Sequence, residues 1–172
     1  MFKDILTEKR RLHRFLRYHE ERDMSPENAL TAIPYTNIIP KDISKILEVG
    51  CGEGAFLTLC LKKGVDAYAV DLRPKVWHED ARRRFSIANA VSLPFRNETF
   101  DLVRENMFFA DIWQCQGLEE SEKVRVATQS FNEMLRVLTP QGYIMSHGIY
   151  ITFIPGSKRL KPLKDCLLYQ KF

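Results

Sequence analysis

The stretch Ile46-Leu47-Glu48-Val49-Gly50-Cys51-Gly52-Glu53-Gly54 places three glycines at alternate positions behind a run of strand-forming residues. Its apolar part, from Lys45 to Val49, predicts a buried β-strand. Glycines between a strand and a helix let a ligand approach the backbone, and the helix N-terminus behind them offers unpaired N–H groups to a carboxylate or phosphate. The loop therefore predicts a binding site for a ligand with an anionic end.

The segments that follow the glycine loop alternate between helix and strand patterns. A helix from Ala55 to Lys63, stopped by Gly64, and a strand "DAYAV" ending at Asp71 complete a βαβ unit. The later segments are a charged helical stretch from Lys75 to Arg84, strands over Phe85 to Ala88 and Thr99 to Phe109, a helix from Val124 to Leu138, a strand from Gly142 to Ile154 broken at Gly148, and a last strand from Cys166 to Phe172. This alternation predicts an α/β fold, a Rossmann-like, mostly parallel sheet with helices on both faces.

The chain is expected to form one domain. It has 172 residues, of which 45% are hydrophobic, and this suits a single globular core of ordinary size. Residues 2–22 have the apolar spacing of an amphipathic helix, and Pro34 and Pro40 predict extended backbone. We therefore expect residues 1–44 to form a helical and extended lid segment over a core of residues 45–172.

Composition excludes several classes of protein. The net charge of +4 is mild and both signs are spread along the chain, which permits a nucleic-acid partner without indicating one. The four cysteines lack metal-site spacing and are expected to be reduced thiols, with no metal bound. No apolar run approaches the roughly 20 residues of a membrane span, and the acidic residues near the start do not fit a signal peptide. A cytoplasmic protein without membrane insertion is expected.

Two cofactor classes fit a glycine loop followed by an acid. Asp71, at the end of the second strand, is placed to accept hydrogen bonds from ribose hydroxyls. Gly50, Gly52 and Ala55 also satisfy the dinucleotide fingerprint. A pyrophosphate beside Glu48 and Glu53 would be repelled by roughly 1 kcal/mol or more per close pair at an effective dielectric of about 20. The acidic rim therefore favours S-adenosylmethionine, which carries a sulfonium and an ammonium, over a nicotinamide dinucleotide.

From Lys45 to Met145 the sequence resembles the class I S-adenosylmethionine-dependent methyltransferases, within them the group related to the ubiquinone and menaquinone biosynthesis methyltransferases. Three motifs in order carry the resemblance: "LEVGCGEG" with "AVDL", "NAVSLPFRNETFDLV", and "EMLRVLTPQGYIM". Only about 25 residues follow the fifth strand, fewer than this family uses, so we expect an antiparallel edge that is truncated or completed by a partner.

The resemblance implies a cofactor site but no catalytic residue. Asn89 stands where the family has an aspartate, and its side-chain oxygen can also accept a bond from the adenine amino group. For Glu105 and Asn106 the alternative is helix capping. His147 is either a general base or structural, and Tyr35 is either a substrate contact or packing. The expected cofactor-binding residues are Glu48, Val49, Gly50, Cys51, Gly52, Gly54, Asp71, Leu72, Asn89, Ala90, Glu105 and Asn106.

The methyl acceptor is expected to be a small molecule. At the end of the fourth strand, "ENMF" does not match the D/N/S-P-P-Y/F/W motif by which adenine and cytosine amino-methyltransferases resemble one another, and no aromatic-basic groove is evident. A nucleic acid or protein acceptor is the alternative, in which Arg82, Arg83 and Arg84 would meet phosphates. A non-catalytic S-adenosylmethionine-binding regulatory module and a nicotinamide-dependent oxidoreductase also stay open. Oligomeric state is not readable.

Overall fold

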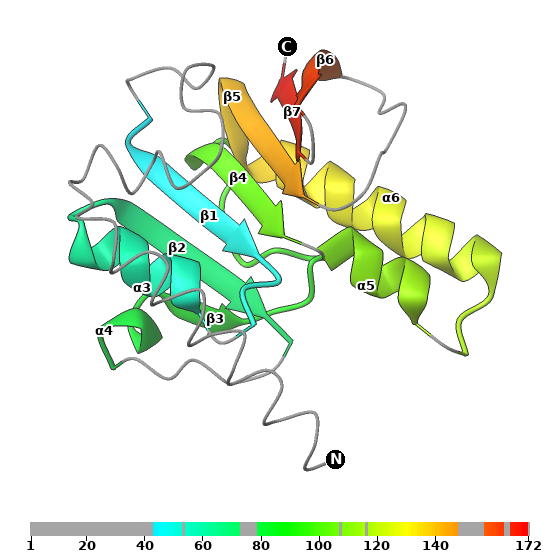
Figure 1. Ribbon diagram of the computed structural model, residues 1–172, viewed down its shortest axis with the longest axis horizontal. Coiled ribbons are helices and arrows are strands. Elements are labelled where there is room, and N and C mark those ends of the chain that lie inside the picture. Colours follow the sequence, from blue (N-terminus) through cyan, green and yellow to red (C-terminus); the bar gives the residue numbers. More distant parts are fainter. Residues whose placement is uncertain are drawn as a thin grey trace.

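The computed structural model describes residues 43–52, 54–72, 79–106, 108–115, 117–147, 157–163 and 166–171. Within these residues a seven-stranded sheet has the order β3-β2-β1-β4-β5-β7-β6, with helices packed against it (Figure 1). The strands are β1 (Lys45–Val49), β2 (Asp66–Asp71), β3 (Phe85–Ile87), β4 (Phe100–Asn106), β5 (Leu138–His147), β6 (Ser157–Leu163) and β7 (Cys166–Lys171). The helices are α3 (Ala55–Lys62), α4 (Glu79–Arg82), α5 (Phe108–Gln114) and α6 (Glu120–Val137).

The first five strands of this order, β3-β2-β1-β4-β5, are mutually parallel, which confirms the predicted fold class. The order along the sheet reverses at β1, whose neighbours are β2 on one side and β4 on the other. The crevice at such a switch point, beyond the carboxyl ends of the strands, is where open α/β sheets bind ligands. The glycine loop leaves β1 at this place.

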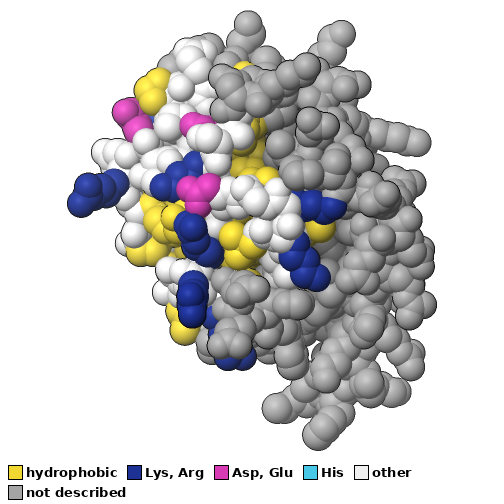
Figure 2. All heavy atoms as spheres, turned by 90° about the vertical axis from the view of Figure 1, so that its left-hand side faces the viewer, with side chains coloured by type: hydrophobic (Ala, Val, Ile, Leu, Met, Phe, Trp, Pro, Cys, Tyr) yellow, Lys and Arg dark blue, Asp and Glu magenta, His cyan; other side chains and the backbone are white. Residues whose placement is uncertain are grey.

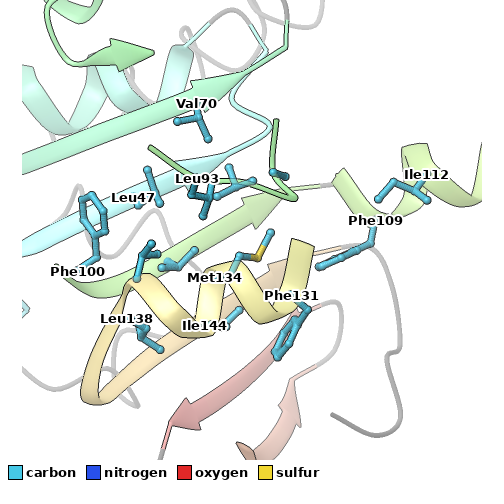
Figure 3. Packing of buried hydrophobic residues seen from close by; sticks show 14 residues of the cluster. Leu47, Val70, Leu93, Phe100, Phe109, Ile112, Phe131, Met134, Leu138 and Ile144 are labelled. Atoms are coloured by element: carbon cyan, nitrogen blue, oxygen red, sulfur yellow. The ribbon is translucent and has the colours of Figure 1, made fainter. Parts of the chain in front are cut away.

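The sheet has a separate hydrophobic core on each face because successive side chains of a strand point to opposite sides. Ile46 packs on one face with Phe56 and Leu57 of α3. Leu47 packs on the other face with residues of α5 and α6 (Figure 3). The second core includes Leu47, Val49, Val70, Leu93, Phe100, Val103, Phe109, Ile112, Phe131, Met134, Val137, Leu138 and Ile144. The helices therefore cover both faces of the sheet, as predicted.

Most elements between residues 45 and 147 lie where the sequence predicts them, but α5 was not predicted and three boundaries differ by three residues or more. Helix α6 begins at Glu120 rather than at Val124. The strand expected over Thr99 to Phe109 ends at Asn106, and Phe108 already belongs to α5. The strand expected from Gly142 begins at Leu138, directly after α6. A register shift between Leu102 and Phe100 in the β4–β5 pairing accommodates the early start, with Gln141 at a positive φ of 65°.

The expectation of a truncated antiparallel edge is wrong. Strand β7 pairs antiparallel with β5, and β6 pairs antiparallel with β7, so the chain itself supplies this edge. Strand β6 was not expected, because its sequence "SKRLKPL" is charged and contains a proline. Such residues suit a strand at the outer edge of a sheet, where lysines and prolines discourage further pairing.

Several predictions lie outside the described residues. These are the lid segment at 1–42 with its helix and Tyr35, Glu53, the start of the helix expected from Lys75, and the part of the last long strand from Gly148 to Ile154 with its expected break. The described part of the helix expected over Lys75 to Arg84 is α4, the short helix Glu79–Arg82. In the part of the chain that the structure describes, no helix is both long enough and apolar enough to cross a membrane.

Candidate functional site

The glycine loop between β1 and α3 is held in place from the end of β2. The backbone N–H groups of Gly50 and Cys51 both donate to the carbonyl oxygen of Val70, at 2.9 and 3.2 Å. Gly50, Gly52 and Gly54 all have positive φ, at 73°, 55° and 76°. Residues with a side chain rarely adopt this left-handed conformation, so the spacing of the three glycines is required by the path of the backbone.

The surroundings of Gly50 and Gly52 differ. A Cβ atom placed on Gly50 would lie 3.1 Å from the side chain of Phe108, so the start of the loop is closed by packing. A Cβ atom placed on Gly52 would have no atom of the described residues within 4 Å. Gly52 therefore presents bare backbone to open space, as expected of the residue that a ligand approaches.

Asp71 reaches the loop from the last position of β2. Its Oδ2 accepts a hydrogen bond of 2.8 Å from the backbone N–H of Gly52. Leu72, which follows Asp71, is 64% exposed. Ile87, the partner of Asp71 in the β2–β3 register, is 62% exposed. The structure thus brings the predicted residues Gly52, Asp71 and Leu72 together at the carboxyl end of the sheet, beside the exposed side chain of Ile87.

Glu48 does not belong to an exposed acidic rim, contrary to the sequence-based expectation. Its side chain is only 5% exposed and forms a buried ion pair with Arg104 of β4. The two residues are direct partners in the β1–β4 register, so their side chains share a face of the sheet. The Arg104 guanidinium also lies 4.2 Å from the centre of the Phe56 ring of α3. Glu48 therefore lies beneath the loop, between sheet and helix.

Burial dominates the acid–base properties of this region. It raises the pKa of the Glu48 carboxyl to about 7, with a further rise from the charge of Asp71 and an opposing effect from Arg104. One carboxylate oxygen of Glu48, Oε2, has no hydrogen-bond partner among the described residues. Burial and the nearby Glu48 also raise the thiol pKa of Cys51, and that of Cys60 to about 12. Both thiols are therefore protonated, and neither is activated as a nucleophile.

Asn89 and Ala90 begin a loop that returns to the same edge of the sheet. The backbone N–H of Ala88 donates to the carbonyl oxygen of Asp71 at 3.0 Å, which places this loop next to the end of β2. The Asn89 side-chain oxygen accepts a bond of 3.2 Å from the Val91 N–H, and its carbonyl accepts one from Ser92. Asn89 thus forms a turn. Its expected contact with adenine remains a prediction.

Glu105 is fully buried and caps a helix. Its Oε2 accepts a bond of 3.0 Å from the Phe108 N–H at the start of α5, and its Oε1 accepts one from the Ser146 hydroxyl of β5. The capping alternative is therefore realised in the structure. Asn106 and His147 are register partners at the carboxyl ends of β4 and β5, but their side chains lie outside the described part of the chain.

The sequence analysis missed three charged residues that contact predicted site residues or the loop that follows them. Arg104 is a basic residue inside an apolar strand, and such a position signals a buried acidic partner. Glu133 and Arg136 of α6 form an ion pair that also holds the segment 93–97. They lie in the motif "EMLRVLTPQGYIM", where only the helix and the following turn were interpreted. Nothing in the pattern says which loop the pair contacts.

A family model described as "Methyltransferase domain" matches residues 47–146. Among solved structures, a protein from Pyrococcus horikoshii is similar with a TM-score of 0.52 and 24% identity, over 70% of this chain and 54% of that one. A protein from Methanosarcina mazei, titled as SAM-dependent methyltransferase, is similar with a TM-score of 0.54 and 18% identity, over 80% of this chain and 78% of that one. The chain thus spans about half the length of the Pyrococcus protein. No curated protein matches the sequence.

Proposed function

Because the family model covers more than half of its sequence, the chain belongs to the methyltransferase domain family, and we propose that it transfers a methyl group from S-adenosylmethionine to an acceptor. The observation that carries this proposal is the glycine loop between β1 and α3, with Gly52 facing open space beside the carboxylate of Asp71. S-adenosylmethionine would supply a methyl carbon already activated by the sulfonium. The chain's own residues would bind and align it.

The residues around the loop fit this cofactor. Asp71 has two oxygens and about four acceptor sites, so it can hold the Gly52 N–H and still accept from ribose hydroxyls. The exposed side chains of Leu72 and Ile87 offer an apolar surface next to that carboxylate. Asn89 and Ala90, which follow β3, would receive the adenine. These residues are proposed to hold the nucleoside, and the loop backbone the amino-acid end.

The charge of Glu48, which in the sequence favoured S-adenosylmethionine over a dinucleotide, does not distinguish the two ligands in the structure. Glu48 is buried and paired with Arg104, so its charge is largely balanced where a pyrophosphate would bind. Membership of the methyltransferase domain family favours S-adenosylmethionine instead. The nicotinamide alternative is therefore tested directly by ligand binding.

We propose a small molecule as the acceptor. Figure 2 views the molecule from the left of Figure 1, the side where β1 and β2 begin, and shows Lys and Arg side chains interspersed with acidic ones. Arg84, on the amino-end side, is paired with Asp66 at 2.7 Å. The glycine loop lies at the opposite ends of these strands. Arg84 thus lies away from the site, which supports a small acceptor over a nucleic acid held by Arg82, Arg83 and Arg84.

Ligand binding tests the proposed cofactor. We expect S-adenosylhomocysteine to raise the melting temperature and to give a saturable heat in titration calorimetry, and we expect no such effect from NAD. The reverse pattern would replace the proposal with an oxidoreductase.

Turnover is tested with S-adenosylmethionine carrying a labelled methyl group, over a panel of small acceptors, RNA and proteins. Transfer to a small molecule supports the proposed acceptor class, and transfer to a polymer contradicts it. Cofactor binding without transfer to any acceptor would favour a regulatory module.

A further inference from the structure

Glu133 and Arg136 form a bidentate ion pair on α6. The Nε and Nη2 atoms of Arg136 lie 2.7 and 2.8 Å from the two carboxylate oxygens of Glu133. Side chains three residues apart on a helix are neighbours, and the paired bonds fix the plane of both groups. The hydrogen bonds from Arg136 lower the pKa of Glu133, with a smaller contribution from the Leu93 N–H, so the carboxyl is ionised at neutral pH.

The same pair holds a loop that is about 40 residues away in the sequence. Arg136 donates from Nη2 to the carbonyl of Leu93 at 2.9 Å, and from Nη1 to the carbonyl of Phe95 at 2.8 Å. A third bond runs from Nη1 to the side-chain oxygen of Asn97 at 2.9 Å. Glu133 in turn accepts from the backbone N–H of Leu93 at 2.7 Å.

The Glu133–Arg136 pair forms a clamp on residues 93–97, and this segment follows directly after the residues at the proposed cofactor site. Asn89 and Ala90 lie three to four positions before Leu93, and both Ala90 and Leu93 are buried in the core under α6. The residues between Ile87 and Phe100 form no helix or strand. The loop is held by the Ala88 bond to Asp71 at one end, by the packing of its apolar side chains in the middle, and at the other end by backbone bonds to the end of α6 and by the Glu133–Arg136 pair. Among these anchors, the pair supplies the side-chain bonds to Leu93, Phe95 and Asn97.

We propose that Glu133 and Arg136 are positioning residues for the nucleoside part of the cofactor, acting through the loop from Asn89 to Asn97. This inference rests on the proposed function. Ordering a loop on binding costs conformational entropy, and a loop already held by its own protein does not incur that cost. Loss of the clamp should therefore weaken binding of any ligand that uses Asn89 and Ala90, without a direct contact between the pair and the ligand.

The central test is Arg136→Lys, which keeps the charge but cannot reach three oxygens and the carboxylate at once. We expect its affinity for S-adenosylhomocysteine, measured by calorimetry on folded protein, to fall about tenfold. The affinity for adenosine should fall by the same factor, because both ligands share the nucleoside. Amide hydrogen exchange at Leu93 should become faster. Arg125→Lys, an exposed position on the same helix, is the matched control and should match the wild type.

Two further variants make the test graded. Asn97→Ala removes one contact of the clamp and should weaken binding of S-adenosylhomocysteine by about twofold. Glu133→Gln removes the ion pair, and its affinity should lie between those of Asn97→Ala and Arg136→Lys. Asn97→Ala and Glu133→Gln also keep the inference testable if Arg136→Lys does not fold. A lower melting temperature with unchanged affinity for both ligands would show that the clamp supports the fold only, and would overturn the inference.

The outcome for the proposed function stays separate from that for the clamp. Wild-type protein that binds no S-adenosylhomocysteine contradicts the proposed function, and the positioning role falls with it. Wild-type binding combined with equal affinity in folded Arg136→Lys contradicts the positioning role alone. Weaker binding of S-adenosylhomocysteine with unchanged binding of adenosine also contradicts it, because the effect would then lie at the amino-acid end.

Discussion

The backbone N–H of Gly52 donates a hydrogen bond of 2.8 Å to Oδ2 of Asp71, which ties the centre of the glycine loop to the last residue of β2. The donor of the loop and the acid of the second strand, read from the sequence as two separate ligand contacts, thus contact each other directly. A ligand at this place would join an existing contact and share the carboxylate with Gly52.

Asp71→Ala should weaken the binding of S-adenosylhomocysteine by about 1–3 kcal/mol, because the ribose hydroxyls and the Gly52 N–H would both lose their acceptor. Titration calorimetry measures the change. Asp66→Ala, at the other end of the same strand, is the control and should leave the affinity unaltered. Equal affinity of Asp71→Ala and wild type would remove Asp71 from the site.

Gly52→Val should abolish cofactor binding, because the new side chain would occupy the open space that the ligand is proposed to use. Its left-handed backbone also costs about 1–2 kcal/mol for a residue with a Cβ atom. Gly64→Val controls for that cost, since Gly64 also has a positive φ and no atom of the described part of the chain near its Cβ position, but lies outside the loop. We expect similar losses of stability in both variants and loss of binding in Gly52→Val alone. A folded Gly52→Val protein with normal affinity would place the pocket elsewhere.

The stability of the protein should depend on pH through Glu48. Burial raises the pKa of its carboxyl from 4.5 to about 7, so the folded state binds this proton more tightly than the unfolded state does. The resulting contribution to stability is fully present below pH 4.5 and is lost as the pH rises through 7. It corresponds to roughly 3 kcal/mol for this shift. Glu48→Gln should flatten this part of the pH profile, measured by urea unfolding between pH 4.5 and 8. A profile equal to that of the wild type would contradict the assignment.

Arg104→Met should lower the free energy of unfolding by about 3–5 kcal/mol at pH 8, because it leaves the Glu48 carboxylate buried without its partner. The double variant Glu48→Gln/Arg104→Met should regain much of that loss, since no buried charge remains. Urea unfolding of the two variants measures the difference. If the double variant is as unstable as the single one, the loss of packing against Phe56, rather than the loss of charge, explains the effect.

Glu105→Ala should destabilise the fold by about 2–4 kcal/mol while cofactor affinity stays unchanged in the folded protein. The loss combines the cap of α5 with an unpaired Ser146 hydroxyl. Urea unfolding measures the loss of stability, and titration calorimetry on the same samples measures the cofactor affinity. An affinity loss of tenfold or more would support the sequence-based prediction that Glu105 contacts the cofactor.

Much of the parallel part of the fold could be predicted because its signals are local. A run of strand formers, three glycines that permit left-handed backbone, and a helix with a clear stop predict the first βαβ unit, and the bounds of β1, α3 and β2 agree with it. The end of β4 was less readable, because Met107, Phe108 and Phe109 suit a strand as well as a helix. The bond from Phe108 to Glu105 decides for the helix.

The sequence by itself determined the glycine loop, its place after the first strand and the family to which the chain belongs, since these depend on residues close together in the chain. Only the tertiary structure decided what the charged residues do. Glu48 was read as a rim acid but pairs with a base 56 positions away, and Arg136 contacts a loop about 40 residues away. The partner of a buried charge depends on which strands and helices lie side by side, and a local pattern of residues does not contain that information.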